Sequence, residues 1–188
     1  MTFMARRLHS NWAVLLLLLA WFHHRASAQK LGEYEIKAGF LYHFANYTEW
    51  PDEAFADKNA PFTFGILGEN PVSEILNGFT NSLVHDRPVR IKKCSSWDEA
   101  RDCHLLFIGS SEKNKLAEIL VHLKTRSILT VAAETDSFLD SGGIINLITA
   151  NNRVGFEINV AAAKEAKLKI SSQVLSLAKR VKGQRPER

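Results

Sequence analysis

The chain has 188 residues, and its 24 Lys and Arg residues outnumber its 20 Asp and Glu residues, which gives a formal net charge of +4. Three of the arginines and none of the acids lie in residues 1–28, so residues 29–188 carry +4 less 3, or +1. The chain also lacks a basic run interleaved with aromatic residues, so we expect no nucleic-acid partner.

Residues 1–28 have the three-part layout of a secretory signal peptide. Arg6 and Arg7 give a positive start, residues 12–22 are apolar throughout, and small residues precede a cleavage point after Ala28. The alternative is a retained membrane anchor, but the apolar run has only 11 residues, whereas a spanning helix needs about 20. We therefore expect an exported protein, with one ordinary domain in the 160 residues that remain.

The first element after this leader is a predicted helix over residues 33–50, where Ile36, Phe40 and Phe44 recur at helical spacing. Trp50 ends it, because the residue before a proline is pushed out of the helical region. Apolar runs of strand length then alternate with short helical segments. We predict strands over residues 61–67, 87–93, 103–109, 127–133, 142–149 and 153–159. We predict further helices over residues 70–76, 95–101, 110–124, 134–140, 160–167 and 171–181.

Two of these segments carry patterns that predict which side chains are buried. In residues 153–159 the alternating apolar positions should face the core and the polar positions should face away from it. Asn159, at the end of that strand, is placed to cap the helix that follows. The helix over residues 110–124, which a serine should cap, has one apolar face. That face consists of Leu116, Ile119, Leu120 and Leu123.

Strands that alternate with helices predict an α/β fold in a single domain, with a mixed, largely parallel sheet and helices on both of its faces. The strands over residues 142–149 and 153–159 are only three residues apart, so we expect a C-terminal antiparallel hairpin, followed by helices. The domain should span residues 29–182, and residues 183–188 should form a polar tail.

No group of residues at motif spacing predicts an enzyme, a metal site or a cofactor. The segment Asp140–Gly143, DSGG, matches the centre of the signature around a serine-protease nucleophile, but Leu139 replaces the glycine that should precede it. A helix end that turns into a strand explains the two glycines better. The sequence has no HExxH motif and no close histidine pair. We therefore expect a protein without catalysis, metal or cofactor.

The chain contains two cysteines, Cys94 and Cys103, and both lie in the part that would be exported. In an oxidising compartment two cysteines are expected to form one disulfide. The alternative is a pair of buried thiols. Closing so short a loop would stabilise the fold by about 2.5–3 kcal/mol on the chain-entropy estimate.

Aromatic residues are concentrated in one segment of the chain. Six of them lie within residues 34–50, and one helix cannot point all six inward. We therefore expect Tyr42, Tyr47 and Trp50 to lie at a surface that meets a partner.

Two interpretations of Glu157 remain open. It has no second carboxylate or histidine at the spacing that acid–base catalysis needs, so we assign it, together with Arg153, to a partner-binding surface. Alternatively, it pairs with Arg153 or with a cross-strand neighbour.

Ser110 and Ser111 open a helix after a buried strand, where backbone N–H groups could bind a small anion.

The assembled pattern resembles the YfiR/HmsC-like family of small exported regulatory proteins. The resemblance runs from about Tyr34 to Val181, and its segments are IKAGFLYHFANYTEWP, FGILGENP, CHLLFIG and GGIINLITANNRVGFEINVAAAKEAKLKISSQVLSLAK. Two positions depart from the family pattern: His43 stands where we expect asparagine, and Lys167 where we expect a glycine that closes a helix. A lysine in a left-handed cap costs about 1 kcal/mol, so we expect a different cap there.

The resemblance implies a periplasmic α/β protein that tends to form homodimers. The best-known members hold a membrane diguanylate cyclase inactive by contacting its periplasmic sensor region, and an outer-membrane lipoprotein can sequester them. Loss of such an inhibitor raises cyclic di-GMP and favours biofilm formation. The alternative function is a periplasmic small-ligand-binding protein that serves a transporter or a sensor.

Overall fold

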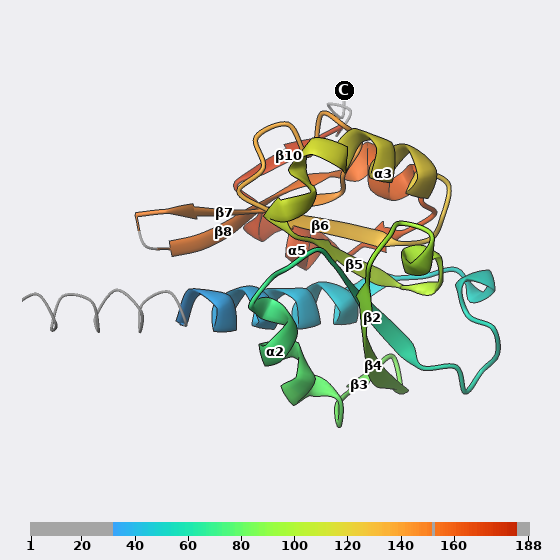
Figure 1. Ribbon diagram of the computed structural model, residues 1–188. Helices are drawn as coiled ribbons and strands as arrows, with labels where there is room; N and C mark the ends of the chain where they lie inside the picture. The colour runs from blue at the N-terminus through green and yellow to red at the C-terminus, as the bar shows by residue number, and fades with distance from the viewer. Residues whose placement is uncertain (1–31, 152, 184–188) are drawn as a thin grey trace, which may run out of the picture.

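An eight-stranded sheet forms the centre of the protein in the computed structural model, which describes residues 32–151 and 153–183 (Figure 1). The predicted signal peptide over residues 1–28 lies outside the described residues, and so does the predicted tail beyond residue 183. The strand order in the sheet is β10-β8-β7-β6-β5-β2-β4-β3. Its strands are β2 (Phe62–Leu67), β3 (Leu83–Val84), β4 (Arg87–Cys94), β5 (Leu105–Ile108), β6 (Leu129–Ala133), β7 (Ile145–Ala150), β8 (Arg153–Asn159) and β10 (Arg180–Lys182).

Parallel pairing dominates this sheet. The pairs β4–β2, β2–β5, β5–β6, β6–β7 and β8–β10 are parallel, whereas β7–β8 and β3–β4 are antiparallel. Every residue of β2 and β5 is buried, because a central parallel strand is covered on both faces. The predicted α/β class, the largely parallel sheet and the C-terminal hairpin are thus confirmed.

Helices lie on both faces of the sheet (Figure 1). A helix over residues 32–46 and α2 pack into one apolar core, and α3 packs into a second core on the other side. The remaining helices are short. The α-helices after residue 46 are α2 (Val72–Leu76), α3 (Leu116–Leu123), α4 (Val160–Glu165) and α5 (Ser172–Leu177), with 3₁₀ segments at Asp52–Ala54, Asn77–Phe79, Glu99–Asp102 and Ser110–Lys115.

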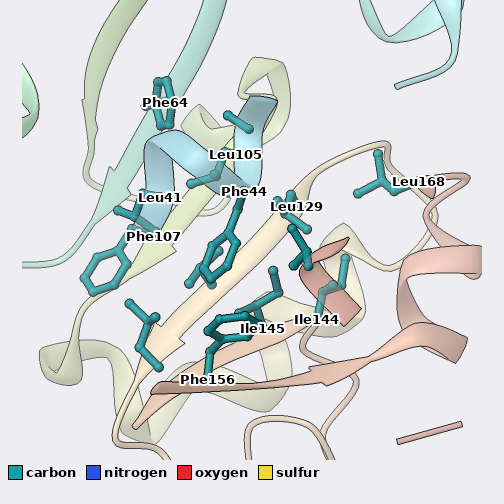
Figure 2. Packing of buried hydrophobic residues seen from close by; sticks show 14 of the residues in the cluster. Leu41, Phe44, Phe64, Leu105, Phe107, Leu129, Ile144, Ile145, Phe156 and Leu168 are labelled. Carbon is teal, nitrogen blue, oxygen red and sulfur yellow. The ribbon is translucent and has the colours of Figure 1, made fainter. Parts of the chain in front are cut away.

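Aromatic packing attaches the helix over residues 32–46 to the hairpin. Phe44 of this helix meets Phe156 of β8 edge to face, with ring centroids 4.9 Å apart (Figure 2). Such aromatic pairs contribute about 0.5–1.5 kcal/mol beyond the burial of their area.

In the second core, the apolar face predicted for α3 is confirmed. Leu116, Ile119, Leu120 and Leu123 are all buried there.

Residues 134–140 form turns, so the predicted helix over this segment is wrong. Glu134 has a φ of 55°, which no helix accommodates. Phe138 turns inward and is fully buried against Gly143, where a Cβ would lie 2.3 Å from the Phe138 ring. So short a segment has little helical stability of its own, and burial of Phe138 therefore determines its path.

The C-terminal segment also departs from the prediction. The helix expected over residues 171–181 ends at Leu177, and the chain continues as the edge strand β10, which extends the sheet beside β8. Side chains of β10 anchor it, because Arg180 pairs with Glu157 and Lys182 with Asp140. Hydrogen bonding of residues 180–182 to the edge of β8 outweighs the weak helical preference of this short segment.

Two further predicted helices are shorter and tighter than expected. The segment over residues 95–101 contains only the 3₁₀ turn Glu99–Asp102. The segment over residues 110–124 begins as a 3₁₀ helix, and neither that turn nor α3 has a side-chain cap, so the predicted serine cap is wrong. Polar residues fill this first part, and without a cap or a buried face they do not extend the α-helix toward the N-terminus.

Lys167 ends α4 in the left-handed conformation, with a φ of 58°. Our expectation of a different cap is therefore wrong: the lysine adopts the conformation that suits glycine. Leu168 N–H donates to the carbonyl of Ala163 at 2.9 Å, which closes the turn. Nζ of Lys167 lies 3.1 Å from Oε1 of Glu53. Because an exposed pair contributes less than about 1 kcal/mol, burial of Leu168 must help to offset the backbone cost.

Candidate functional site

An apolar hollow of about 310 Å³ lies between the helix over residues 32–46, the strand β8 and α5; we call it the Tyr47 hollow. Buried side chains of Phe44, Phe156 and Val174 form its floor. Figure 2 shows Phe44 and Phe156 directed toward each other from the helix and from β8. The complete lining is Phe40, His43, Phe44, Tyr47, Phe156, Gln173, Val174 and Leu177.

A small two-stranded sheet holds the two sides of this hollow together. It pairs β1 (Thr48–Glu49) with β9 (Lys169–Ile170), two segments that are far apart in the sequence. Directly beyond this ladder, Ser171 N–H donates to the carbonyl of Tyr47 at 2.9 Å. The Ser171 side chain then accepts from the N–H of Val174 and caps α5. The end of the first helix and the start of α5 are therefore fixed next to each other.

Large apolar side chains remain exposed at the rim of the Tyr47 hollow. Tyr47 is 44% exposed and Leu177 is 71% exposed. Leu177 lies three residues after the buried Val174, where a helical pattern would place another buried residue. An exposed aromatic and an exposed leucine next to an apolar depression are typical of a surface that contacts another molecule.

The aromatic residues predicted for the partner surface separate into two groups. Tyr47 lies at the rim of the hollow, but Tyr42 and Trp50 are half-buried and make internal hydrogen bonds. The Tyr42 hydroxyl donates to the carbonyl of Leu83 at 2.9 Å, and Nε1 of Trp50 donates to the carbonyls of His104 and Ser127 at 3.2 and 3.0 Å. Both side chains thus connect elements of the fold.

Glu157 lies on the opposite side of β8 from this hollow. Successive side chains of a strand point to opposite faces, and Phe156 is part of the hollow's floor. Both carboxylate oxygens of Glu157 accept from Arg180, at 2.9 and 3.0 Å. Arg180 is the register partner of Glu157 on the neighbouring strand β10, so the expected pairing with a cross-strand neighbour is confirmed. The alternative pairing with Arg153 is wrong, and Arg153 is exposed at the start of β8. The five residues predicted to bind a partner therefore do not form one surface.

Sequence reasoning missed three residues at the rim of the hollow: His43, Gln173 and Leu177. For Leu177 a signal existed, because it is an apolar residue in a segment where Val174 already supplies the buried position. The predicted helix over residues 171–181 concealed it, since a longer helix would have placed Leu177 within its interior. For His43 and Gln173, nothing local in the sequence indicates a shared surface.

Ser110 and Ser111 were the predicted anion site. Ser111 lines a depression of about 630 Å³ at the carboxyl ends of β2 and β4, but its hydroxyl accepts from the N–H of Glu69 at 3.3 Å and donates to Glu112 at 3.2 Å. Glu69, Glu74 and Glu112 all line the depression, against the single cation Lys93. This charge balance disfavours an anion, and binding at these serines stays a prediction that the structure does not support.

The predicted disulfide is not formed in this structure. Cys94 and Cys103 are free, buried thiols whose Sγ atoms lie 4.0 Å apart. The hydrogen bond from Cys103 lowers the pKa of Cys94, while the same bond and burial raise the pKa of Cys103. Gly65 makes room for this pair, because a Cβ there would lie 2.5 Å from Sγ of Cys103. The two sulfurs are neighbours, and their oxidation to a disulfide stays a prediction.

His104 is buried and acts as a structural residue. Its Nδ1 accepts from the N–H of Thr63 at 3.0 Å, so Nε2 carries the proton and donates to the carbonyl of Ala54 at 3.1 Å. Burial lowers the pKa of His104 to about 4, which leaves the ring neutral near pH 7.

Within residues 32–151 and 153–183, no group of three or more His, Cys, Asp or Glu residues is arranged to hold a metal ion.

The fold and the Tyr47 hollow together define an α/β domain with an exposed apolar surface suited to contact with another molecule. The chain belongs to the YfiR/HmsC-like family, whose model matches residues 34–179. That range contains every residue that lines the hollow. The family suggests a periplasmic regulator of diguanylate cyclase signalling.

No curated protein matches the chain. A crystal structure of a conserved domain protein from Vibrio cholerae O1 biovar El Tor str. N16961 is similar, with 14% identity, a TM-score of 0.47 and coverage of 64% of this chain. The match covers 54% of that protein, so the chain corresponds to about half of its length. Among the described helices, none combines the length and the apolar character needed to cross a membrane.

Proposed function

We propose that this protein is an exported, non-enzymatic regulator that binds the periplasmic region of a membrane diguanylate cyclase and holds the cyclase inactive. Binding would lower cyclic di-GMP and limit biofilm formation. The observation that carries the proposal is the family match over residues 34–179, which spans nearly the whole described domain. A homodimer and sequestration by an outer-membrane lipoprotein belong to the same proposal, because the family resemblance implies them.

The Tyr47 hollow is the surface that we propose for the cyclase contact. Tyr and other large side chains at the centre of a partly apolar surface supply most of the binding energy in protein interfaces. Tyr47 and Leu177 stand at the rim, and the buried Phe44 and Phe156 would give an inserted apolar side chain a firm, apolar contact. Burial of the exposed part of Leu177 alone would favour association, since apolar area removed from water contributes about 25 cal/mol per Å².

Site-directed crosslinking in living cells tests this surface. A photo-crosslinking amino acid at Leu177 should capture a membrane diguanylate cyclase. Val121 is the matched control, because it is also 71% exposed but lies on α3, which packs against the other core. The same residue introduced at Val121 should capture no cyclase. Capture from Val121 and not from Leu177 would place the contact on the other face.

The regulatory effect has its own measurement. Deletion of the gene should raise cellular cyclic di-GMP, and expression of the wild-type protein should restore the lower level. We expect Leu177→Asp to fold but to fail in this restoration, whereas Val121→Asp should restore it fully. An unchanged level after deletion, in every condition in which the protein is made, would contradict the regulator function itself.

A further inference from the structure

A second cavity, of about 530 Å³, lies at the amino ends of the parallel strands and shares no residue with the Tyr47 hollow. Thr63 at the start of β2 and Cys103, just before β5, belong to its lining, together with Ile128, just before β6. Arginines from three separate segments surround this interior. The charged side chains that line the cavity are Glu53, Arg90, Arg101, Asp102, Arg126 and Lys167.

Positive charge predominates in this cavity, with four cationic side chains against two carboxylates. Lys167 is neutralised by its pair with Glu53. Arg101 pairs with Asp98, which is not part of the lining. Arg90 and Arg126 are different: neither forms an ion pair within the described part of the chain. Two guanidinium groups therefore face the same cavity without a carboxylate partner.

A largely buried threonine, Thr63, also lines the cavity. Thr63 is only 6% exposed. Its N–H donates to Nδ1 of His104 at 3.0 Å. Its neighbours Phe62 and Phe64 face the larger core, so the Thr63 side chain points to the opposite face, toward the cavity. A threonine hydroxyl at this position can donate a hydrogen bond to a ligand oxygen.

We propose that this cavity binds a small organic anion whose phosphate or carboxylate group is held by Arg90 and Arg126, with the Thr63 hydroxyl as a third contact. Guanidinium groups match the oxygens of both anions through paired hydrogen bonds, and they are less strongly hydrated than ammonium groups. The cavity volume lies within the range of about 300–1,000 Å³ that is usual for small-molecule sites. Cys103 and Ile128 supply apolar contacts for the body of the ligand.

Titration of the full exported protein with two simple anions tests the site. Pyrophosphate and citrate are the probes, with binding followed by calorimetry and by amide NMR shifts at fixed ionic strength. We expect saturable binding of at least one probe with a Kd of about 1 mM or lower, and the largest shifts at Thr63, Arg90 and Arg126. The preferred probe distinguishes a phosphate ligand from a carboxylate ligand. No saturable binding of either probe would overturn the proposal.

Three substitutions locate the binding. Arg90→Gln and Arg126→Gln should each weaken the Kd about tenfold, as expected for the loss of a charge-assisted hydrogen bond. Thr63→Val keeps the side-chain shape and should weaken it a few-fold, with an unchanged circular dichroism spectrum. Arg153→Gln is the control, because Arg153 is exposed and lies outside the cavity. An equal loss in Arg153→Gln, or no loss in the two cavity arginine variants, would show non-specific charge attraction and overturn the site.

Discussion

The buried side-chain amide of Asn159 makes two hydrogen bonds, one through its oxygen and one through its nitrogen. Its Oδ1 accepts from the N–H of Ala162 at 3.1 Å and caps α4, and its Nδ2 donates to the carbonyl of Leu139 at 2.9 Å. We expect Asn159→Ala to lower the free energy of unfolding by about 2 kcal/mol, because both bonds are lost. Ser171→Ala removes only a cap and should cost about 0.5–1 kcal/mol. Equal losses in urea unfolding would contradict the double role.

Glu157 is a residue whose role the sequence left open. Its carboxylate pairs with Arg180, on the side of β8 away from the Tyr47 hollow. We expect Glu157→Ala to restore the low cyclic di-GMP level in a deletion strain as well as wild type does. Its free energy of unfolding should fall by no more than about 1 kcal/mol, since the pair is partly exposed. A folded Glu157→Ala protein that no longer lowers cyclic di-GMP would move the partner contact to the β10 edge.

Among the elements, the helix over residues 32–46 is held by a buried charge as well as by its aromatic side chains. Lys37 is buried, and its Nζ lies 2.8 Å from Oε1 of Glu134 and also pairs with Glu33. The hydrogen bond from Lys37 lowers the pKa of Glu134 below its usual value. The ion pair therefore connects this helix to the turn that follows β6.

The stability that this ion pair contributes should depend on pH. A carboxyl whose pKa is lower in the folded state stabilises the fold above its unfolded-state pKa of about 4.3, and this contribution is lost as the pH falls through the lower folded-state pKa. We expect Glu134→Gln to be less stable than wild type at pH 7, and the difference to shrink as the pH falls below about 4.3. Urea midpoints measure it. Glu165→Gln, from an exposed pair with Lys124, is the control and should change little.

For the whole molecule, a bond between Cys94 and Cys103 would link the end of β4 to the segment just before β5, within the second core. In periplasmic protein we expect this bond to be formed. Thiol labelling of the denatured, unreduced protein should then detect no free thiol, and reduction should lower the free energy of unfolding by about 2.5–3 kcal/mol. A variant with alanine at both positions should not respond to the reductant. Two labelled thiols in protein taken directly from the periplasm would contradict the disulfide.

The sequence by itself determined the features that depend on residues close together along the chain. The alternation in residues 153–159 identified Phe156 and Ile158 as core residues, and the three-residue link over residues 150–152 required a hairpin. The spacing of leucines identified the buried face of α3, and the position of Asn159 identified a helix cap. These features were predictable because periods of 2 and 3.6 residues, and a cap, are local properties of the backbone.

Only the tertiary structure decided the features that depend on distant partners. Tyr42 and Trp50 are structural because their polar atoms reach carbonyls of residues 41 to 77 positions away. The Tyr47 hollow exists because β1 pairs with β9 across a long separation. Residues 134–140 are turns because Phe138 is buried against Gly143. In each case a non-local contact outweighs a local preference that is worth only a fraction of a kcal/mol per residue.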